Sequence, residues 1–254
     1  MGNEKQLPVN YDEQLAKMAA QLQDKLSPIR GVKITVAQNK MFNFPDGTQT
    51  PGPFHAVIVN FLSGNFFFKG RFDAQNITPP ACFAIGPEPL KLAPSRNAPE
   101  PQSPECNSCP NNQFGSEGKG KACKNQRLLA VLVVPEGGEI TTETPLWTLA
   151  LSPTALKSFD SYALKVARMY NATPVKVVSH IGFDPNVDFP SIRFGQPRPN
   201  EWLPECMSRI TEGFELLSAE PDVSQFNKTM TVAPSRNAAI PRAPVKGAFM
   251  RRPT

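Results

Sequence analysis

The chain has 254 residues and a formal net charge of +5, from 27 Lys and Arg against 22 Asp and Glu. Its 28 Pro and 16 Gly together exceed the average combined usage of these residues but fall short of a wholly disordered composition. The 40% hydrophobic content is enough for a core, and the longest apolar run, Leu128 to Pro135, is far too short to span a bilayer. Collagen, coiled-coil and membrane classes are therefore excluded, and we expect one or two folded domains with long loops.

The first 30 residues have the pattern of a surface helix. Apolar residues recur at helical spacing from Leu15 to Leu26, and Ser27-Pro28 ends the pattern. We therefore expect an N-terminal helix within residues 1–30. The acidic residues of this segment are atypical of a signal or transit peptide, so we expect a cytoplasmic protein.

Alternating and continuous apolar runs predict a β-rich body over residues 31–218. We expect the runs 55–62 and 65–72 to form a hairpin that turns at Ser63-Gly64. The other predicted strands cover 32–36, 128–134, 146–151, 175–181 and 191–194. Helices are predicted from 156 to 169, after a Ser152-Pro153 cap, and from 204 to 217.

An insertion at residues 79–126 interrupts this pattern. From Pro79 to Lys124 the chain carries nine Pro and four of its five Cys, with hardly any periodic hydrophobicity. Such a segment cannot offset its ordering entropy by apolar burial. We therefore expect either that a metal holds it or that it is disordered.

Four cysteines in the insertion have the spacing of a metal site. Cys106 and Cys109 form a C-x2-C knuckle, with Cys82 24 positions before it and Cys123 14 positions after it. Zinc takes four such ligands in tetrahedral geometry, and one knuckle supplies two of them. We predict a structural Zn²⁺ ion, with two alternatives left open: a [4Fe-4S] cluster, which uses the same ligands, and free or disulfide-forming thiols.

Catalytic motifs are absent from the sequence, which has no P-loop, G-x-G-x-x-G, G-x-S-x-G or H-E-x-x-H. His55 and His180 lie on predicted strands, and we interpret both as structural. Cys206 is interpreted as a buried, neutral thiol. The acidic residues between Asp184 and Glu205 fit a solvated loop better than a Mg²⁺ site. We therefore predict that the protein is not an enzyme.

Aromatic and cationic side chains are interleaved from Phe66 to Phe72. Strand alternation directs Phe66 and Phe68 toward the core and places Phe67 with the neighbouring cations on the other face. Phe67 would then stack on a base while the cations contact phosphates. The alternative is that both rows of Phe are core. The predicted nucleic-acid residues are Phe67, Lys69, Arg71, Lys119, Lys121, Lys124 and Arg127.

The C-terminal segment, residues 219–254, has the composition of a flexible basic tail. Its last 32 residues contain six cations and no acid. The hexapeptide Ala93–Ala98 is repeated letter for letter at Ala233–Ala238. Two short copies do not make a repeat architecture, so we interpret them either as similar extended loops or as an Arg-bearing docking strip used twice.

The arrangement resembles a known family. The knuckle from Cys106 to Pro110, the run Lys121-Ala122-Cys123 and the strand Leu129–Val134 look like proteins of tailed bacteriophages. The order of elements over residues 32–170 is similar to that of the zinc-containing single-stranded-DNA-binding proteins of large tailed phages. The resemblance implies an α+β, β-rich fold: an OB-like β-barrel with an inserted four-cysteine metal-binding subdomain and a few helices.

The chain departs from that family in two respects. The family's metal site includes a His where this chain offers Cys82 or Cys123. The family's tail is acidic and recruits replication partners, whereas this tail is basic. If the chain binds DNA, its tail should add affinity.

We therefore expect a phage single-stranded-DNA-binding protein for replication or recombination, acting in the cytoplasm of the infected bacterial host. Expected partners are single-stranded DNA, phage replication or host proteins, and further copies of the chain, with no membrane. Two alternatives stay open. One is a phage structural or host-interaction protein with a zinc-stabilised loop and extended arms. The other is an iron-sulfur or zinc enzyme of nucleic-acid metabolism.

Overall fold

The computed structural model describes residues 15, 17, 18, 32–70 and 78–224. Leu15, Lys17 and Met18 are helical, while the rest of the predicted N-terminal helix lies outside the described residues. The same holds for Arg71 and for the tail after Ser224.

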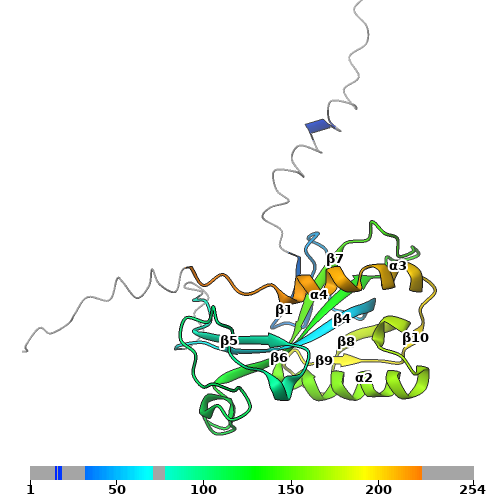
Figure 1. Cartoon of the computed structure of the whole chain (residues 1–254). Coiled ribbons are helices and arrows are strands. Elements are labelled where there is room, and N and C mark those ends of the chain that lie inside the picture. Colours follow the sequence, from blue (N-terminus) through cyan, green and yellow to red (C-terminus); the bar gives the residue numbers. More distant parts are fainter. Residues whose placement is uncertain (1–14, 16, 19–31, 71–77, 225–254) are drawn as a thin grey trace, which may run out of the picture.

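The chain folds as an α+β protein in which a curled sheet forms a half-barrel with helices on both faces (Figure 1). The strands are β1 (Lys33–Ala37), β2 (Met41–Asn43), β3 (Gln49–Thr50), β4 (Phe54–Phe67), β5 (Cys82–Gly86), β6 (Cys123–Val133), β7 (Leu146–Leu151), β8 (Val177–Phe183), β9 (Ile192–Phe194) and β10 (Arg198–Pro199). The α-helices are α2 (Leu156–Tyr170), α3 (Leu203–Ser208) and α4 (Ile210–Ser218). Short 3₁₀ turns are η2 (Pro89–Lys91), η3 (Pro110–Asn112), η4 (Pro153–Ala155) and η5 (Pro174–Lys176).

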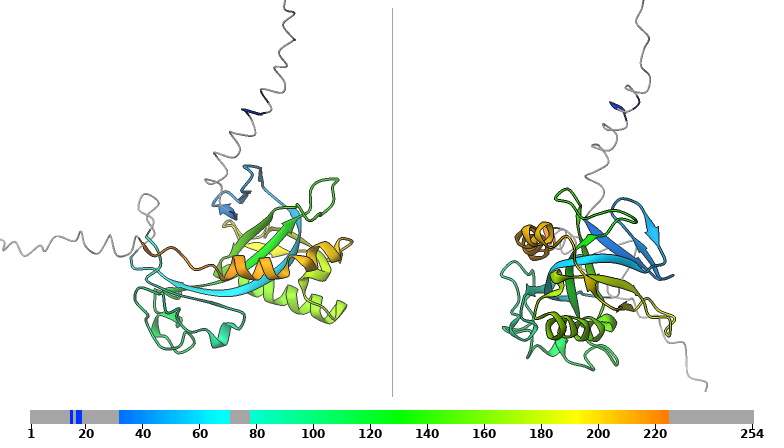
Figure 2. Two further views of the ribbon diagram at one scale, coloured as in Figure 1. Left: turned by 45° about the horizontal axis from the view of Figure 1, so that its top comes forward. Right: turned by 90° about the vertical axis from the view of Figure 1, so that its right-hand side faces the viewer.

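Strand β4 lies at the centre of the sheet. One edge of β4 pairs antiparallel with β6 along almost its whole length. The other edge pairs with β8 near the start of β4 and with β5 near its end. Beyond β6 the order continues through β7, β1, β2 and β3, with β1 parallel to β7. A bulge between Ile58 and Asn60 bends β4, and the sheet curls as Figure 2 shows.

Helices cover both faces of the sheet in the region where β4 pairs with β6 and β8. On one face α2 buries Phe159, Tyr162 and Val166, which recur at helical spacing, against the strands. On the other face α4 approaches β4 closely because Gly213 has no side chain; a Cβ there would lie 3.0 Å from Val59. Cys206 is fully buried in that second core, as predicted from its sequence context.

The predicted hairpin at Ser63-Gly64 is wrong, because β4 runs straight through these residues. Gly64 serves close packing within the strand: a Cβ at this position would lie 2.6 Å from the ring of Phe66. A glycine inside a strand pattern can mark a site of close approach and need not mark a turn. The two predicted strands are therefore one 14-residue strand, and the chain turns only after Phe67.

Other element predictions are confirmed, with shifted ends. The strand predicted from residue 128 begins at Cys123, and the insertion contains a strand, β5, that the sequence pattern did not indicate. The helix predicted over 204–217 is divided at Arg209 into α3 and α4. The α+β, β-rich class with few helices is confirmed, whereas the OB topology stays a prediction. None of the described helices is long and apolar enough to cross a membrane.

Asp184 is buried and is not part of a solvated loop. Its carboxylate accepts hydrogen bonds from Arg193 at 2.6 and 2.8 Å and from the Asn186 backbone at 3.0 Å. These contacts, led by the Asn186 bond, lower the pKa of Asp184. The Asp184 carboxylate thus stabilises the conformation of the loop between β8 and β9.

The two histidines meet across β4 and β8. The ring centroids of His55 and His180 are 5.3 Å apart, and Arg198 of β10 is a further nearby cation. Burial lowers the pKa of His55 below 6.5, and the charges of Arg198 and His180 act in the same direction.

We expect the free energy of unfolding to fall as the pH drops below about 6.5, because the unfolded chain then binds more protons at His55 than the folded chain does. Urea unfolding between about pH 7.5 and about pH 5.5 measures this dependence. The His55→Gln variant should show a weaker dependence on pH in this range. An unchanged dependence in that variant would contradict the assignment to His55.

Candidate nucleic-acid groove and cysteine pocket

Two features occupy opposite faces of the β4–β6 ribbon near the end of β4. Residues directly opposite each other in a sheet share a face. The register pairs Phe67 with Cys123 on one face and Phe66 with Lys124 on the other. The first face carries the cysteine pocket, and the second carries an open groove.

The cysteine pocket brings together all four predicted ligands. Cys82, Cys106, Cys109 and Cys123 are buried and line one cavity with about 10 Å³ of free space, room for roughly one water molecule. Burial raises the pKa of Cys123 to about 12, with the three other cysteines as further causes. Burial also raises the pKa of Cys82 and of Cys106. The topology explains the convergence, because β5 and β6 begin at Cys82 and Cys123 on either side of β4.

Side-chain amides attach the knuckle to the sheet. Asn125 on β6 donates to Asn65 on β4 at 2.6 Å and to Asn112 of η3 at 2.9 Å. Asn112 donates to the Cys106 carbonyl at 2.8 Å, and Asn65 hydrogen-bonds the Cys106 thiol. These asparagines were not among the predicted site residues, because nothing in the local sequence pattern separates them from loop residues.

The donor set fits a zinc ion in number and type, since four buried sulfurs surround one small space. The described residues nevertheless contain no group of three or more His, Cys, Asp or Glu arranged to hold a metal ion. All five cysteines are free of disulfides. The four-cysteine metal-binding subdomain is therefore a proposal.

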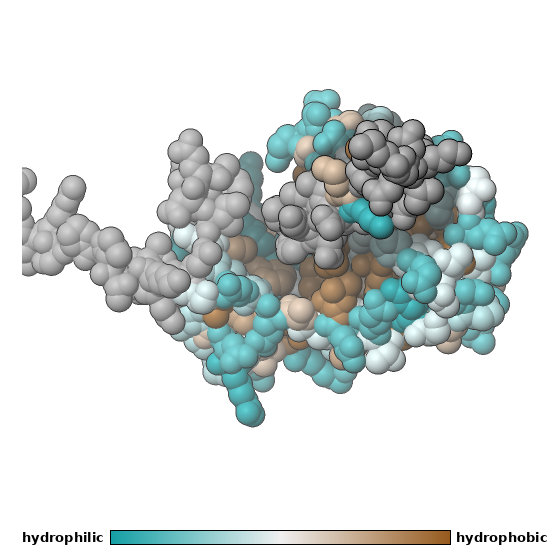
Figure 3. Space-filling model, turned by 90° about the horizontal axis from the view of Figure 1, so that it is seen from above, coloured by the Kyte–Doolittle hydropathy of each residue, from teal (hydrophilic) through white to brown (hydrophobic). Residues whose placement is uncertain are grey.

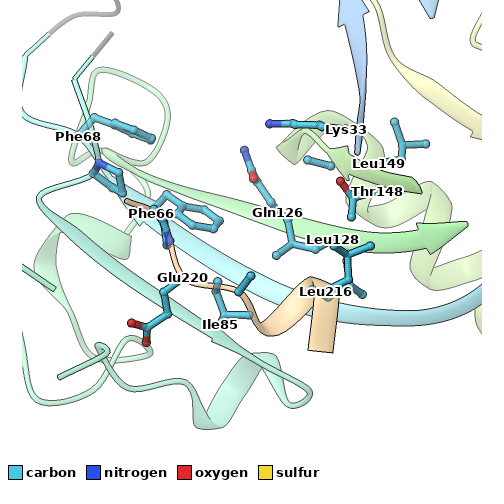
Figure 4. A pocket seen from close by; sticks show the side chains of 15 residues that line it. Lys33, Phe66, Phe68, Ile85, Gln126, Leu128, Thr148, Leu149, Leu216 and Glu220 are labelled. Atoms are coloured by element: carbon cyan, nitrogen blue, oxygen red, sulfur yellow. The ribbon is translucent and has the colours of Figure 1, made fainter. Parts of the chain in front are cut away.

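The open groove has a volume of about 440 Å³ and lies between the sheet and the segment after α4 (Figures 3 and 4). Figure 3 shows hydrophobic side chains gathered in a hollow on this side of the molecule. The residues that line the groove are Lys33, Phe66, Phe68, Pro80, Ile85, Gln126, Leu128, Thr148, Leu149, Ala150, Leu216, Leu217, Ala219, Glu220 and Pro221.

Two aromatic side chains and a few polar groups give the groove its character. Phe66 lies beside Gln126 and Leu128, and Phe68 and Lys33 project from other parts of the rim (Figure 4). Phe68 is 40% exposed. Glu220 points away from the groove, because Ser95 and Asn97 bind its carboxylate.

The structure reverses the predicted roles of the two Phe faces. Phe67, predicted to stack on a base, lines the cysteine pocket beside Cys123. Phe66 and Phe68, predicted to enter the core, line the open groove. The alternation itself is correct, but the insertion covers the face that the sequence analysis left open to solvent.

The predicted phosphate-binding cations that the structure describes fall into three groups, while Arg71 lies outside the described residues. Lys69 and Lys124 form partly exposed ion pairs with Glu100 and Glu117. Lys119 and Lys121 lie on the loop that follows the knuckle. Arg127 instead reaches Asp160 of α2 with two hydrogen bonds of 3.1 Å, and its side chain is only 13% exposed.

Comparisons of the chain with protein-family models, with curated proteins and with solved structures find no match.

Arg127→Ala should destabilise the protein by about 1–3 kcal/mol, because it removes a charge-assisted pair that joins β6 to α2. The expected effect is a lower midpoint of urea unfolding. Oligonucleotide affinity at a temperature where the variant is folded should stay at the wild-type level. A loss of affinity with unchanged stability would return Arg127 to the phosphate-binding set.

Proposed function

We propose that the chain binds single-stranded DNA in the open groove, as a phage protein of replication or recombination that acts in the cytoplasm of the infected host. The observation that carries the proposal is the pairing of Phe66 and Phe68 with Gln126 and Lys33 in one groove of about 440 Å³. Exposed aromatic rings beside cations and amides are what single-strand-binding proteins use to stack bases and contact the backbone.

Each side chain has a definite role in the proposal. Phe66 and Phe68 stack on successive bases, which gives affinity with little dependence on sequence. Gln126 and Thr148 offer hydrogen bonds to base edges or sugars, and Lys33 contacts a phosphate. The groove volume is within the range of ordinary ligand sites, so it would hold only a short stretch of the bound strand.

The existing ion pairs do not prevent phosphate binding. Partly exposed pairs such as Lys69–Glu100 and Lys124–Glu117 contribute about 0–1 kcal/mol, and each lysine keeps exposed surface that a phosphate can approach without breaking the pair. The six cations of the C-terminal segment add a sequence-independent attraction. Arg127 takes no part, because Asp160 and burial hold it.

We also propose a structural zinc ion in the cysteine pocket. The four sulfurs supply the charge and ligand type that zinc needs, and the small enclosed space suits one ion better than a [4Fe-4S] cluster. When bound, the ion would cross-link the starts of β5 and β6 through the knuckle. It has no catalytic task, and we propose a binding protein, not an enzyme.

The first test is fluorescence anisotropy with a labelled oligo-dT of about 16 nucleotides, the upper end of OB-fold site sizes. Binding should be micromolar or tighter and should weaken steeply between about 50 and about 200 mM salt. Phe68→Ala should weaken binding about 5- to 100-fold, because it removes one stacking ring that is already partly exposed.

Phe189→Ala is the matched control, since Phe189 is also half-exposed but lies in the loop before β9. It should bind like the wild-type chain. Flat titrations of the wild-type chain would refute the proposed function. Equal affinities for Phe68→Ala and the wild-type chain would remove the groove from the binding site.

Metal analysis should find one zinc per chain. Cys109→Ser should unfold the insertion, β5 included, and leave the rest of the sheet largely formed, because the variant loses a cross-link that the proposed ion would provide. Limited proteolysis should then cut the variant between Pro79 and Lys124. Iron with absorbance near 400 nm would instead identify a cluster, and protection of the variant's insertion would count against any metal-held loop.

The second candidate is a phage structural or host-interaction protein. The apolar part of the groove lining, with Ile85, Leu128 and Leu216, favours it because such a lining would also accept a protein segment. This candidate predicts copurification with particles or a host protein and no response to the oligonucleotide.

A further inference from the structure

Phe114 is exposed on the loop between the knuckle and Cys123. Its side chain is 81% exposed, more than any other large hydrophobic residue that the structure describes. Burying a Phe side chain contributes a favourable free energy of about 1.5–3 kcal/mol. Because this ring is exposed, a partner that covers it would gain that free energy on binding.

The loop holds the ring in a defined place. The Gln113 side-chain amide donates to the Asn107 carbonyl at 2.8 Å and to the Cys109 carbonyl at 3.2 Å. The Ser116 hydroxyl donates to Gln113 and accepts from the Ala122 backbone at 2.9 Å.

A backbone hydrogen bond between two glycines closes the loop on the C-terminal side of Phe114. Gly115 donates a backbone hydrogen bond to Gly120 at 2.9 Å and has a φ of +91°, in the left-handed region that favours glycine. The loop is thus pre-organised on both sides of Phe114, which lowers the ordering cost of any contact the ring makes.

The side chains around the Phe114 ring are mostly cationic. The Lys121 ammonium lies 5.0 Å from the ring centroid, a cation–π distance. Lys119 is exposed on the same loop, and from residue 113 to 124 the chain carries three Lys against one Glu. A flat aromatic face beside positive charge matches a base attached to a phosphate.

An ion pair joins the loop to the strand that borders the groove. Glu117 of the loop pairs with Lys124, and Lys124 lies directly opposite Phe66 in the β4–β6 register. The exposed ring is therefore attached to the same ribbon end as the groove, although the cysteine pocket occupies the other face of that ribbon.

We propose that Phe114 is a second stacking platform for single-stranded DNA, with Lys121 and Lys119 as its phosphate contacts. This inference rests on the proposed function and extends the binding surface from the groove to the knuckle loop. It gives the insertion a binding task beyond its role in the fold.

The test compares the binding of labelled oligo-dT by the full-length chain and by its Phe114→Ala, Phe114→Tyr and control Phe189→Ala variants. Phe114→Ala should weaken binding about 5- to 100-fold, while Phe114→Tyr and Phe189→Ala should retain wild-type affinity. Unfolding midpoints should be the same for all of them, because the ring is exposed.

A second measurement detects stacking directly. The wild-type chain already fluoresces through Trp147 and Trp202, and Phe114→Trp should add fluorescence to this background. The oligonucleotide should quench the added fluorescence of Phe114→Trp. It should not quench the fluorescence that Phe189→Trp adds. If the wild-type chain and Phe114→Ala bind the oligonucleotide equally well, the inference is overturned and the groove proposal stands. Phe114 would then be a contact for a protein partner and not for DNA. If the wild-type chain does not bind, the proposed function fails, and the inference fails with it.

Discussion

The antiparallel pairing of β4 with β6 positions everything else in the molecule. The register runs from Ala56 to Phe67, with one bulge that bends the pair. Because side chains alternate across a strand, successive residue pairs along this ribbon lie on opposite faces of the sheet. Near the β4 end one face receives the cysteine pocket and the other the groove, so a slip of one residue would exchange Phe66 with Phe67 and destroy both.

Polar contacts hold the insertion where apolar burial is scarce. Its small core of Ala84, Leu92 and Cys106 is supplemented by the buried amides of Asn65 and Asn112 and the half-buried amide of Asn125. A metal ion at the four sulfurs would complete this set of cross-links. Because the loop beyond the knuckle is fixed by its own hydrogen bonds, it can keep an aromatic ring in solvent without collapsing onto it.

Sequence patterns predicted the fold class, most strands, α2 and the convergence of the four cysteines, because periodicity and C-x2-C spacing are local signals. They failed where tertiary packing decides. Gly64 looked like a turn but makes room for Phe66, and Phe67 looked exposed but lies under the insertion. Arg127 looked like a phosphate contact until α2 brought Asp160 to it. Exposure of Phe114 was equally invisible, since no pattern shows what leaves a ring uncovered.

The most direct test of the account is photo-cross-linking of the full-length protein to an oligonucleotide carrying 5-bromodeoxyuridine, followed by mass spectrometry of the cross-linked peptides. Stacked bases cross-link to the aromatic rings they contact. Binding in the groove predicts cross-links in the peptide that contains Phe66 and Phe68, and loss of these cross-links when both residues are replaced by Ala. Cross-links confined to the basic segment after residue 224 would contradict a groove that binds single-stranded DNA.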